Sequence, residues 1–396
     1  MTPFSSDALR RWPDVEADNL FAADAADRLL LDEGTPALGS AAPGEVVVVG
    51  DNYGALTLGA AALRAVTNIR VHQDPLSGEQ ALAHNAHGLG LTGAFRSLPL
   101  GAELLRGARV VLLRLPRSLD AVDEIAGLIA AHADPGVTVY AGGMIKHLAL
   151  AMNEVLHGHF TEVRAGLARQ KARVLTVSTP GGRAPISEQA ASESSWPKSE
   201  FHPDLGLRVC AHGGVFAGTR VDIGTRFLLS VLGEAKPDAA SAIDLGCGTG
   251  VLAAALAMAR PDVTVLATDQ SAAAVASARA TMEANGVADR VQVIRDEGLA
   301  GQPDASTELI LLNPPFHVGA TVHAGLAARL FEDVARVLAP GGELWTVFNS
   351  HLGYRPALTR IVGPTRQVAR NAKFTVTVST RLPLPQGSHP FNRSRS

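Results

Sequence analysis

An Asn-Pro-Pro-Phe segment is the part of the chain best suited to act on an amine. Asn313, Pro314, Pro315 and Phe316 follow the apolar run 309–312, which predicts a buried strand that stops at the two prolines. The Asn313 side-chain carbonyl and a free backbone carbonyl beside the prolines can accept both hydrogens of one NH₂ group. Phe316 offers a flat apolar face on which a base can stack. The segment therefore predicts catalysis on a planar aromatic or amide amine, whose delocalised lone pair must be aimed at an electrophile.

A glycine-rich turn lies upstream of this segment. Gly246, Gly248 and Gly250 separate a predicted strand, 242–245, from a predicted helix, 251–259. Such a turn lets a ligand approach free N–H groups at a helix N-terminus, and it is shared by dinucleotide and S-adenosylmethionine binders. Asp244 distinguishes the two ligands, because a carboxylate there would repel a pyrophosphate but stabilise a cation.

Two further carboxylates follow the next two predicted strands. Asp269 can accept both hydroxyls of a ribose, and Asp296 can accept from an adenine amino group, although Glu297 beside it could serve instead. The alternatives are a helix N-cap for Asp269 and an ordinary turn carboxylate for Asp296. Together with Asp244, these residues match an amino acid, a ribose and an adenine. The set predicts S-adenosylmethionine as the cofactor.

The elements that must position these residues are short strands alternating with helices. β-branched runs occur at 46–50, 110–115, 263–269 and 309–313, with Ala- and Leu-rich stretches between them. This alternation is typical of βαβ units and parallel sheets, in which ligands bind at the carboxyl edge.

An internal repeat indicates that the chain holds two copies of one α/β domain. Gly50 and Gly54 align with Gly246 and Gly250, LLRLP (112–116) aligns with LLNPP (311–315), and the closing strings 168–179 and 369–380 are nearly identical. The offsets stay between 196 and 201 residues. At the chemical positions the first copy differs, since Val48, Asn52, Arg114 and Leu115 replace Asp244, Gly248, Asn313 and Pro314. The first copy is therefore predicted to keep the fold and to lack the site.

The repeat sets the expected domains. Residues 1–178 form a degenerate methyltransferase-like domain, residues 179–205 are rich in Pro, Gly, Ser and charge and predict a linker, and residues 206–396 form the catalytic domain. In each domain we expect an antiparallel edge strand, at 174–179 and at 374–380.

Composition excludes several classes of protein. The 396 residues have 35 basic and 38 acidic side chains, a net charge of −3, so any nucleic-acid site must be a local patch. Two cysteines, without a Cys/His cluster near His317, predict neither a disulfide framework nor a metal site. The N-terminal residues have no signal-peptide pattern, and the apolar stretches are too short to span a bilayer. We expect a cytoplasmic protein.

Longer strings resemble a known family. HGGVFAGTRVDIGTRFLL (212–229), DLGCGTGVLA (244–253), NPPFH (313–317), PGGELWTVFNSHLGY (340–354) and NAKFTV (371–376) are similar to the bacterial guanine-N2 methyltransferases of ribosomal RNA. That family has two types, the small-subunit methyltransferase C and the large-subunit methyltransferase G, and residues 9–31, 46–57 and 112–119 are similar to the second type. The resemblance implies two tandem Rossmann-like class I methyltransferase domains, the first degenerate, and methylation of a guanine N2 amine in 16S or 23S RNA. It assigns Asp222, Gly224 and Thr225 to the entrance of the cofactor pocket.

Basic residues near the two repeat endings are candidates for RNA binding, because cations supply the salt-dependent contacts to phosphate. The first domain would grip RNA while the second methylates it. We expect a monomer with ribosomal RNA or a ribosomal subunit as its partner. The candidates are Arg169, Lys171, Arg173, Arg370 and Lys373.

Three other functions stay open from the residues. An N5-glutamine protein methyltransferase would hold an amide NH₂ in the same two acceptors, and a DNA adenine-N6 methyltransferase would hold a base amine. A non-catalytic RNA-binding assembly factor would keep the glycine turn as a relic, which intact Asp244, Asp269 and Asn313 argue against.

Overall fold

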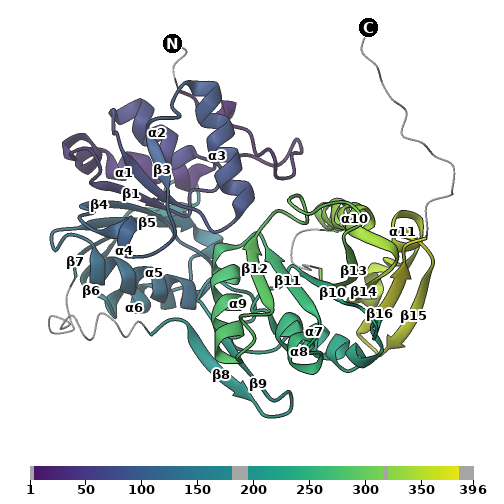
Figure 1. Ribbon diagram of the computed structural model, residues 1–396. Helices are drawn as coiled ribbons and strands as arrows, with labels where there is room; N and C mark the ends of the chain where they lie inside the picture. Colours follow the sequence, from purple (N-terminus) through teal and green to yellow (C-terminus); the bar gives the residue numbers. More distant parts are fainter. Residues whose placement is uncertain (1–3, 181–194, 315–319, 383–396) are drawn as a thin grey trace, which may run out of the picture. The chain divides into compact units, whose positions relative to one another are not determined.

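The chain forms two α/β units, each built on its own sheet. A computed structural model describes residues 4–180, 195–314 and 320–382. By spatial proximity the chain divides into a unit of 1–199 with 210–218 and 270–277, and a unit of 200–209 with 219–269 and 278–396. Figure 1 colours the first sheet purple to blue and the second green to yellow.

The first sheet has seven strands in the order β3-β2-β1-β4-β5-β7-β6. All neighbours pair in parallel except β7, which is antiparallel to both β5 and β6. The strands are β1 (Val46–Val49), β2 (Ile69–His72), β3 (Phe95–Ser97), β4 (Val110–Arg114), β5 (Thr138–Met144), β6 (Phe160–Ala165) and β7 (Ala172–Pro180).

Helices cover both faces of this sheet because its central strands are apolar on both sides. Val46 and Val48 of β1 pack with α1, α2 and α3, whereas Val47 and Val49 pack with α4, α5 and α6. The helices are α1 (Ala25–Ser40), α2 (Ala55–Arg64), α3 (Leu76–Leu89), α4 (Ala102–Leu105), α5 (Leu119–His132) and α6 (Ala151–His157), with 3₁₀ turns at Ser6–Ala8 and Ile145–His147.

The second sheet repeats this topology strand for strand, in the order β12-β11-β10-β13-β14-β16-β15. Again the strand next to the edge, β16, is antiparallel to both neighbours. The strands are β10 (Ser241–Leu245), β11 (Thr264–Asp269), β12 (Val291–Arg295), β13 (Thr307–Leu312), β14 (Leu338–Asn349), β15 (Thr365–Arg370) and β16 (Phe374–Thr380).

One face of the second sheet packs Ile243 and Leu245 of β10 against α10 and α11. Helix α7 contacts β14 and β16, and α8 contacts β10, β11 and β12. The remaining elements are α7 (Ile223–Leu229), α8 (Val251–Ala259), α9 (Ala272–Ala284), α10 (Ala320–Val337), α11 (Arg355–Ile361) and 3₁₀ turns at Leu232–Glu234 and Ser350–Leu352. Among the described helices, none is long and apolar enough to cross a bilayer.

The shared strand order confirms the duplicated α/β architecture, and one detail of the prediction is wrong. Segments 174–179 and 374–380 are antiparallel, but they lie one position inside the sheet edge. The reason is that each forms a hairpin with the preceding strand, β6 or β15, and that strand takes the edge position.

The segment predicted to be a linker contains regular structure at both of its ends. Strand β7 continues to Pro180, and β8 (Lys198–His202) pairs with β9 (Leu207–Ala211) as a separate two-stranded sheet. Backbone pairing satisfies peptide groups in a sequence that lacks an apolar period. Residues 181–194 lie outside the described part of the chain, so the linker boundaries stay a prediction.

Candidate active site

The glycine turn has the backbone geometry that only glycine adopts readily. Gly246, Gly248 and Gly250 have φ angles of +68°, +54° and +77°. A Cβ on Gly250 would lie 2.6 Å from Cε of Met282, so this glycine also lets α8 approach α9. By contrast, a Cβ on Gly246 or Gly248 would meet no described atom within 4 Å. The turn therefore leaves open space for a ligand.

Asp244 lies beneath this turn with its carboxylate buried. The side chain is 1% exposed, and Oδ2 accepts a hydrogen bond of 3.0 Å from the N–H of Ala253, in the first turn of α8. Burial raises the pKa of Asp244 to about 7, and the neighbouring carboxylate of Asp269 acts in the same direction. The charge of Asp244 therefore changes near neutral pH, and this carboxylate lies directly against the first turn of α8.

The other two predicted carboxylates follow the neighbouring strands. Asp269 ends β11 and accepts from the N–H of Gly248 at 3.0 Å, and Asp296 directly follows β12. The backbone N–H of Asp296 donates to the Asp269 carbonyl at 3.0 Å, while its carboxylate accepts from the N–H of Gly301. Because β10, β11 and β12 pair in parallel, all three carboxylates lie at the same edge of the sheet, the one formed by the carboxyl ends of the strands. Their ligand roles stay predictions.

Asn313 directly follows β13, at the same carboxyl edge as the turn. Its Nδ2 donates to Oδ2 of Asp222 at 3.1 Å and to the hydroxyl of Thr225 at 3.0 Å. Its Oδ1 is shielded from solvent and has no hydrogen-bond partner in the described part of the chain. Pro314 is buried next to it. Pro315 and Phe316 lie outside the described residues.

Asp222 and Thr225 come to this site through α7. Asp222 is the N-cap of α7, and its Oδ2 accepts from the backbone N–H groups of Gly224 at 2.8 Å and Thr225 at 3.2 Å. Family resemblance placed these residues at the cofactor entrance. Their hydrogen bonds to Asn313, across 91 and 88 residues, are not visible in the sequence.

Phe374 is a site residue that the sequence reasoning missed. It begins β16 opposite Asn349, and a Cβ added to Gly224 would lie 3.3 Å from its Cε1 and 3.5 Å from Asn313 Nδ2. The only signal was its place in the string NAKFTV. Glycine at 224 lets these side chains pack closely, since a Cβ there would have tight contacts with them.

The basic candidates occupy two equivalent hairpin turns. Arg169, between β6 and β7, pairs with Glu33 at 3.1 Å and with Asp32 at 3.7 Å, which offsets its charge. Lys171 and Arg173 are exposed in the same hairpin. In the second unit, exposed Arg370 ends β15, and Lys373 places its Nζ 5.3 Å from the centroid of the Phe374 ring. The RNA-binding role of these five residues stays a prediction.

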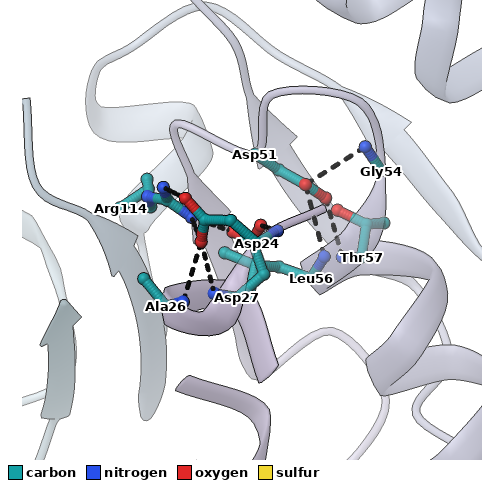
Figure 2. Close-up of polar contacts among 8 residues, drawn as sticks. All are labelled: Asp24, Ala26, Asp27, Asp51, Gly54, Leu56, Thr57 and Arg114. Atoms are coloured by element: carbon teal, nitrogen blue, oxygen red, sulfur yellow. Dashed lines mark hydrogen bonds and ion pairs between the residues drawn. The ribbon is translucent and has the colours of Figure 1, made fainter. Parts of the chain in front are cut away.

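The first unit fills the equivalent edge with its own side chains. Arg114 stands where Asn313 stands in the second unit, and it binds two carboxylates, Asp24 and Asp27 (Figure 2). Asp24 is the N-cap of α1, as Asp222 is of α7. The three residues precede Asp222, Thr225 and Asn313 by 198, 198 and 199 residues. The predicted repeat therefore extends to the side-chain contacts.

Polar side chains also form hydrogen bonds to the backbone in and after the glycine turn of the first unit. Buried Asp51, in the position of Cys247, accepts from the N–H groups of Gly54, Leu56 and Thr57 (Figure 2). Gln73 replaces the predicted ribose carboxylate and donates to backbone carbonyls of the turn. The first N–H groups of α2 thus donate to Asp51 in the turn itself. In α8, the N–H of Ala253 donates to Asp244 in the preceding strand.

Two family models divide the chain between them. One described as the RLMG N-terminal domain matches residues 1–181, and one described as a methyltransferase small domain matches residues 206–378. The described residues contain no group of three or more His, Cys, Asp or Glu side chains arranged to hold a metal ion. The fold, the turn and these matches define an S-adenosylmethionine-dependent methyltransferase with a duplicated domain.

Similar proteins specify the family. The "Ribosomal RNA large subunit methyltransferase G" of Streptomyces avermitilis is 36% identical over 381 residues, covering 95% of this chain and 97% of that protein. The same-named protein of Pseudomonas entomophila is 37% identical, covering 95% and 97%. The T. thermophilus 16S rRNA N2 G1207 methyltransferase (RsmC), solved in complex with AdoMet and guanosine, shares the fold with a TM-score of 0.69 at 22% identity, covering 90% and 92%. The chain belongs to the ribosomal RNA large subunit methyltransferase G family.

Proposed function

We propose that this protein transfers a methyl group from S-adenosylmethionine to the N2 amine of a guanine in large-subunit ribosomal RNA. The relatives described above are named as ribosomal RNA methyltransferases, and a protein of similar fold has been solved with guanosine. The observation that carries the proposal is the buried Asn313 Oδ1, which has no partner in the described part of the chain and lies at the sheet edge that carries the glycine turn. A buried acceptor without a donor costs about 1–3 kcal/mol, which a bound amine would relieve.

The residues fit the cofactor by three features of the second unit. Open space lies beside Gly246 and Gly248, the N-terminus of α8 supplies N–H groups, and carboxylates lie at or next to the carboxyl ends of three adjacent strands. When bound, S-adenosylmethionine supplies a methyl group activated by a sulfonium. Asp244 would stabilise its positive charge, and Asp269 and Asp296 would hold its ribose and adenine.

Asn313 would act on the nucleophile. The guanine N2 lone pair is delocalised into the ring, so the amine is a weak nucleophile. An N2 hydrogen donated to Asn313 Oδ1 favours a pyramidal nitrogen whose lone pair faces the methyl carbon. As the new N–C bond forms and the C–S bond breaks, N2 becomes acidic and gives its second proton to water. No strong base is needed for this step.

RNA would approach through the basic turn of the second unit. Arg370 and Lys373 flank the start of β16, which pairs with the carboxyl end of β14. Cations at this edge would contact phosphates next to the target guanine. We further propose that the protein acts as a monomer in the cytoplasm, where ribosomal RNA is found, and that the first unit contributes RNA affinity.

The proposed reaction is tested by tritiated methyl transfer. The full chain is incubated with labelled S-adenosylmethionine and either deproteinised ribosomal RNA or assembled subunits from a strain lacking the gene. We expect label in large-subunit RNA as N2-methylguanosine. Label in protein instead would favour glutamine N5 methylation and overturn the proposal. Cofactor binding without label in any RNA would also contradict it.

A pH dependence of cofactor binding follows from Asp244. Its pKa of about 7 leaves it partly protonated at neutral pH, and a bound cation favours the ionised form. Binding must therefore displace a proton at low pH. We expect the dissociation constant to rise ~8-fold between pH 7.5 and pH 6, measured by isothermal titration calorimetry.

The matched controls for this pH dependence are two charge-removing variants. Asp244→Asn should bind more weakly and lose the pH dependence. Asp238→Asn changes a carboxylate that is 82% exposed, and it should keep the dependence. A constant affinity for the unmodified protein across this range would show that Asp244 does not sense the cofactor.

A further inference from the structure

The orientation of the Asn313 amide decides whether the site can accept a hydrogen from an amine. An amide has an oxygen that accepts and a nitrogen that donates, and the two ends have nearly the same size. Only the orientation with Oδ1 toward the substrate supports the proposed reaction. The reverse orientation would present two N–H donors to an amine that is itself a donor.

Asp222 is the neighbour that distinguishes the two orientations. Its ionised carboxylate can only accept, so the NH₂ end of Asn313 must face it, as the 3.1 Å contact shows. If the amide were reversed, two acceptor oxygens would meet without a hydrogen between them. The Thr225 hydroxyl, 3.0 Å from the same Nδ2, can donate or accept. It supports either orientation and selects neither.

The Asp222 carboxylate is itself held in place. Its Oδ2 accepts from the backbone N–H groups of Gly224 and Thr225, which fixes the rotamer. Glycine at 224 permits the approach, since a Cβ there would lie 3.0 Å from Oδ2 and 3.5 Å from Asn313 Nδ2. The first turn of α7 thus presents a rigid acceptor to the residue that follows β13.

The first unit shows the same carboxylate position with a different partner. Asp24 caps α1 and binds Arg114, whose guanidinium carries donors only (Figure 2). An acceptor at the helix N-cap that binds a residue at the carboxyl end of the fourth strand is therefore common to both copies. What differs is that Asn313 has a carbonyl on its far side and Arg114 does not.

We infer that Asp222 is a positioning residue: its carboxylate, assisted by the Thr225 hydroxyl, holds the Asn313 amide with Oδ1 toward the guanine N2 amine. This inference rests on the proposed function and adds to it. Asp222 then acts on the turnover step through Asn313, in contrast to a residue that binds the cofactor directly.

The test uses variants of the full chain that change the partners of the Asn313 amide and keep the cap of α7. Asp222→Ser still caps α7, since Ser and Asp are equally good N-caps, but its hydroxyl is one bond shorter than the carboxylate and can donate as well as accept. Thr225→Val removes the hydroxyl, and Thr225→Ser restores it. Asp238→Asn removes an exposed negative charge of the same unit. For each we measure kcat and KM on ribosomal RNA at saturating S-adenosylmethionine, the cofactor Kd, and the thermal midpoint.

We expect Asp222→Ser to lower kcat about 10- to 100-fold while KM, the cofactor Kd and the thermal midpoint stay close to those of the unmodified protein. Thr225→Val should lose about 5-fold, and Thr225→Ser should recover most of that loss. Unchanged kcat in Asp222→Ser would overturn the inference. So would a loss confined to cofactor affinity, which would make Asp222 a cofactor ligand.

A second measurement does not depend on the substrate. The Asn313 NH₂ group should give a slowly exchanging NMR signal, assigned by its loss in Asn313→Ala. In Asp222→Ser the signal should exchange faster, because the amide is no longer held. If the unmodified protein fails to methylate RNA, the proposed function fails, and this signal still decides the orientation. An unchanged signal in Asp222→Ser would overturn the inference.

Discussion

Asn313→Ala is expected to lower kcat for methyl transfer about 10²- to 10³-fold, because it removes the acceptor that aims the amine. This loss corresponds to roughly 3–4 kcal/mol of transition-state stabilisation. Cofactor binding should persist, since the glycine turn and the three carboxylates are unchanged. Single-turnover kinetics with labelled S-adenosylmethionine, together with calorimetry, measures both quantities.

A matched control separates the loss of this amide from the loss of any amide. Gln292→Ala removes an exposed amide from β12 of the same sheet, and it should leave kcat unchanged. If Asn313→Ala retained more than about a tenth of the activity, the amide could not be the main group acting on the nucleophile.

Arg114→Met is expected to destabilise the first unit by about 3 kcal/mol near pH 8. Its side chain is only 15% exposed, and Asp27, one of its two partners, is 5% exposed. Removal of the cation leaves Asp27 buried without its counter-ion, which costs about 3–5 kcal/mol in other proteins. Asp24 adds little because its side chain is 38% exposed.

The destabilisation should depend on pH in a defined direction. Burial raises the pKa of Asp27 to about 6, although Arg114 acts to lower it, so in Arg114→Met this pKa must rise further. A carboxyl group with a raised pKa in the folded state stabilises the fold while protonated, and that contribution is lost as pH rises through the folded-state value. The loss in Arg114→Met should therefore be smaller at pH 5 than at pH 8.

Hydrogen exchange of α1 and β4 peptides in the full chain measures this local stability at both pH values. In the double variant Arg114→Met, Asp27→Asn, most of the stability should return, since Asn can still accept the N–H of Asp24 that completes the capping box. An equal loss at pH 5 and pH 8 would contradict a role for the buried charge.

Local sequence patterns predicted much of this fold. The strands that end at Leu245, Asp269, Arg295 and Leu312 follow from short β-branched runs, and α8 spans the predicted residues. The repeat predicted the duplication because equivalent strands need equivalent apolar runs and glycine turns at a constant spacing. Which strand forms the edge of each sheet was not predictable from the sequence. Strands β6 and β15 have weak apolar patterns, and they take the edge positions because they pair with β7 and β16.

For the site, local sequence was enough to predict which residues reach the carboxyl edge. Asp244 lies one residue before the end of β10, Asp269 ends β11, and Asp296 and Asn313 follow β12 and β13, positions that depend only on strand boundaries. Tertiary structure alone decided what those side chains bind. Asp222 meets Asn313 across 91 residues, and Arg114 meets Asp24 across 90, because α7 and α1 pack against their sheets. Side-chain hydrogen bonds between separate elements leave no periodic trace in a sequence, so their partners emerge only when the elements pack.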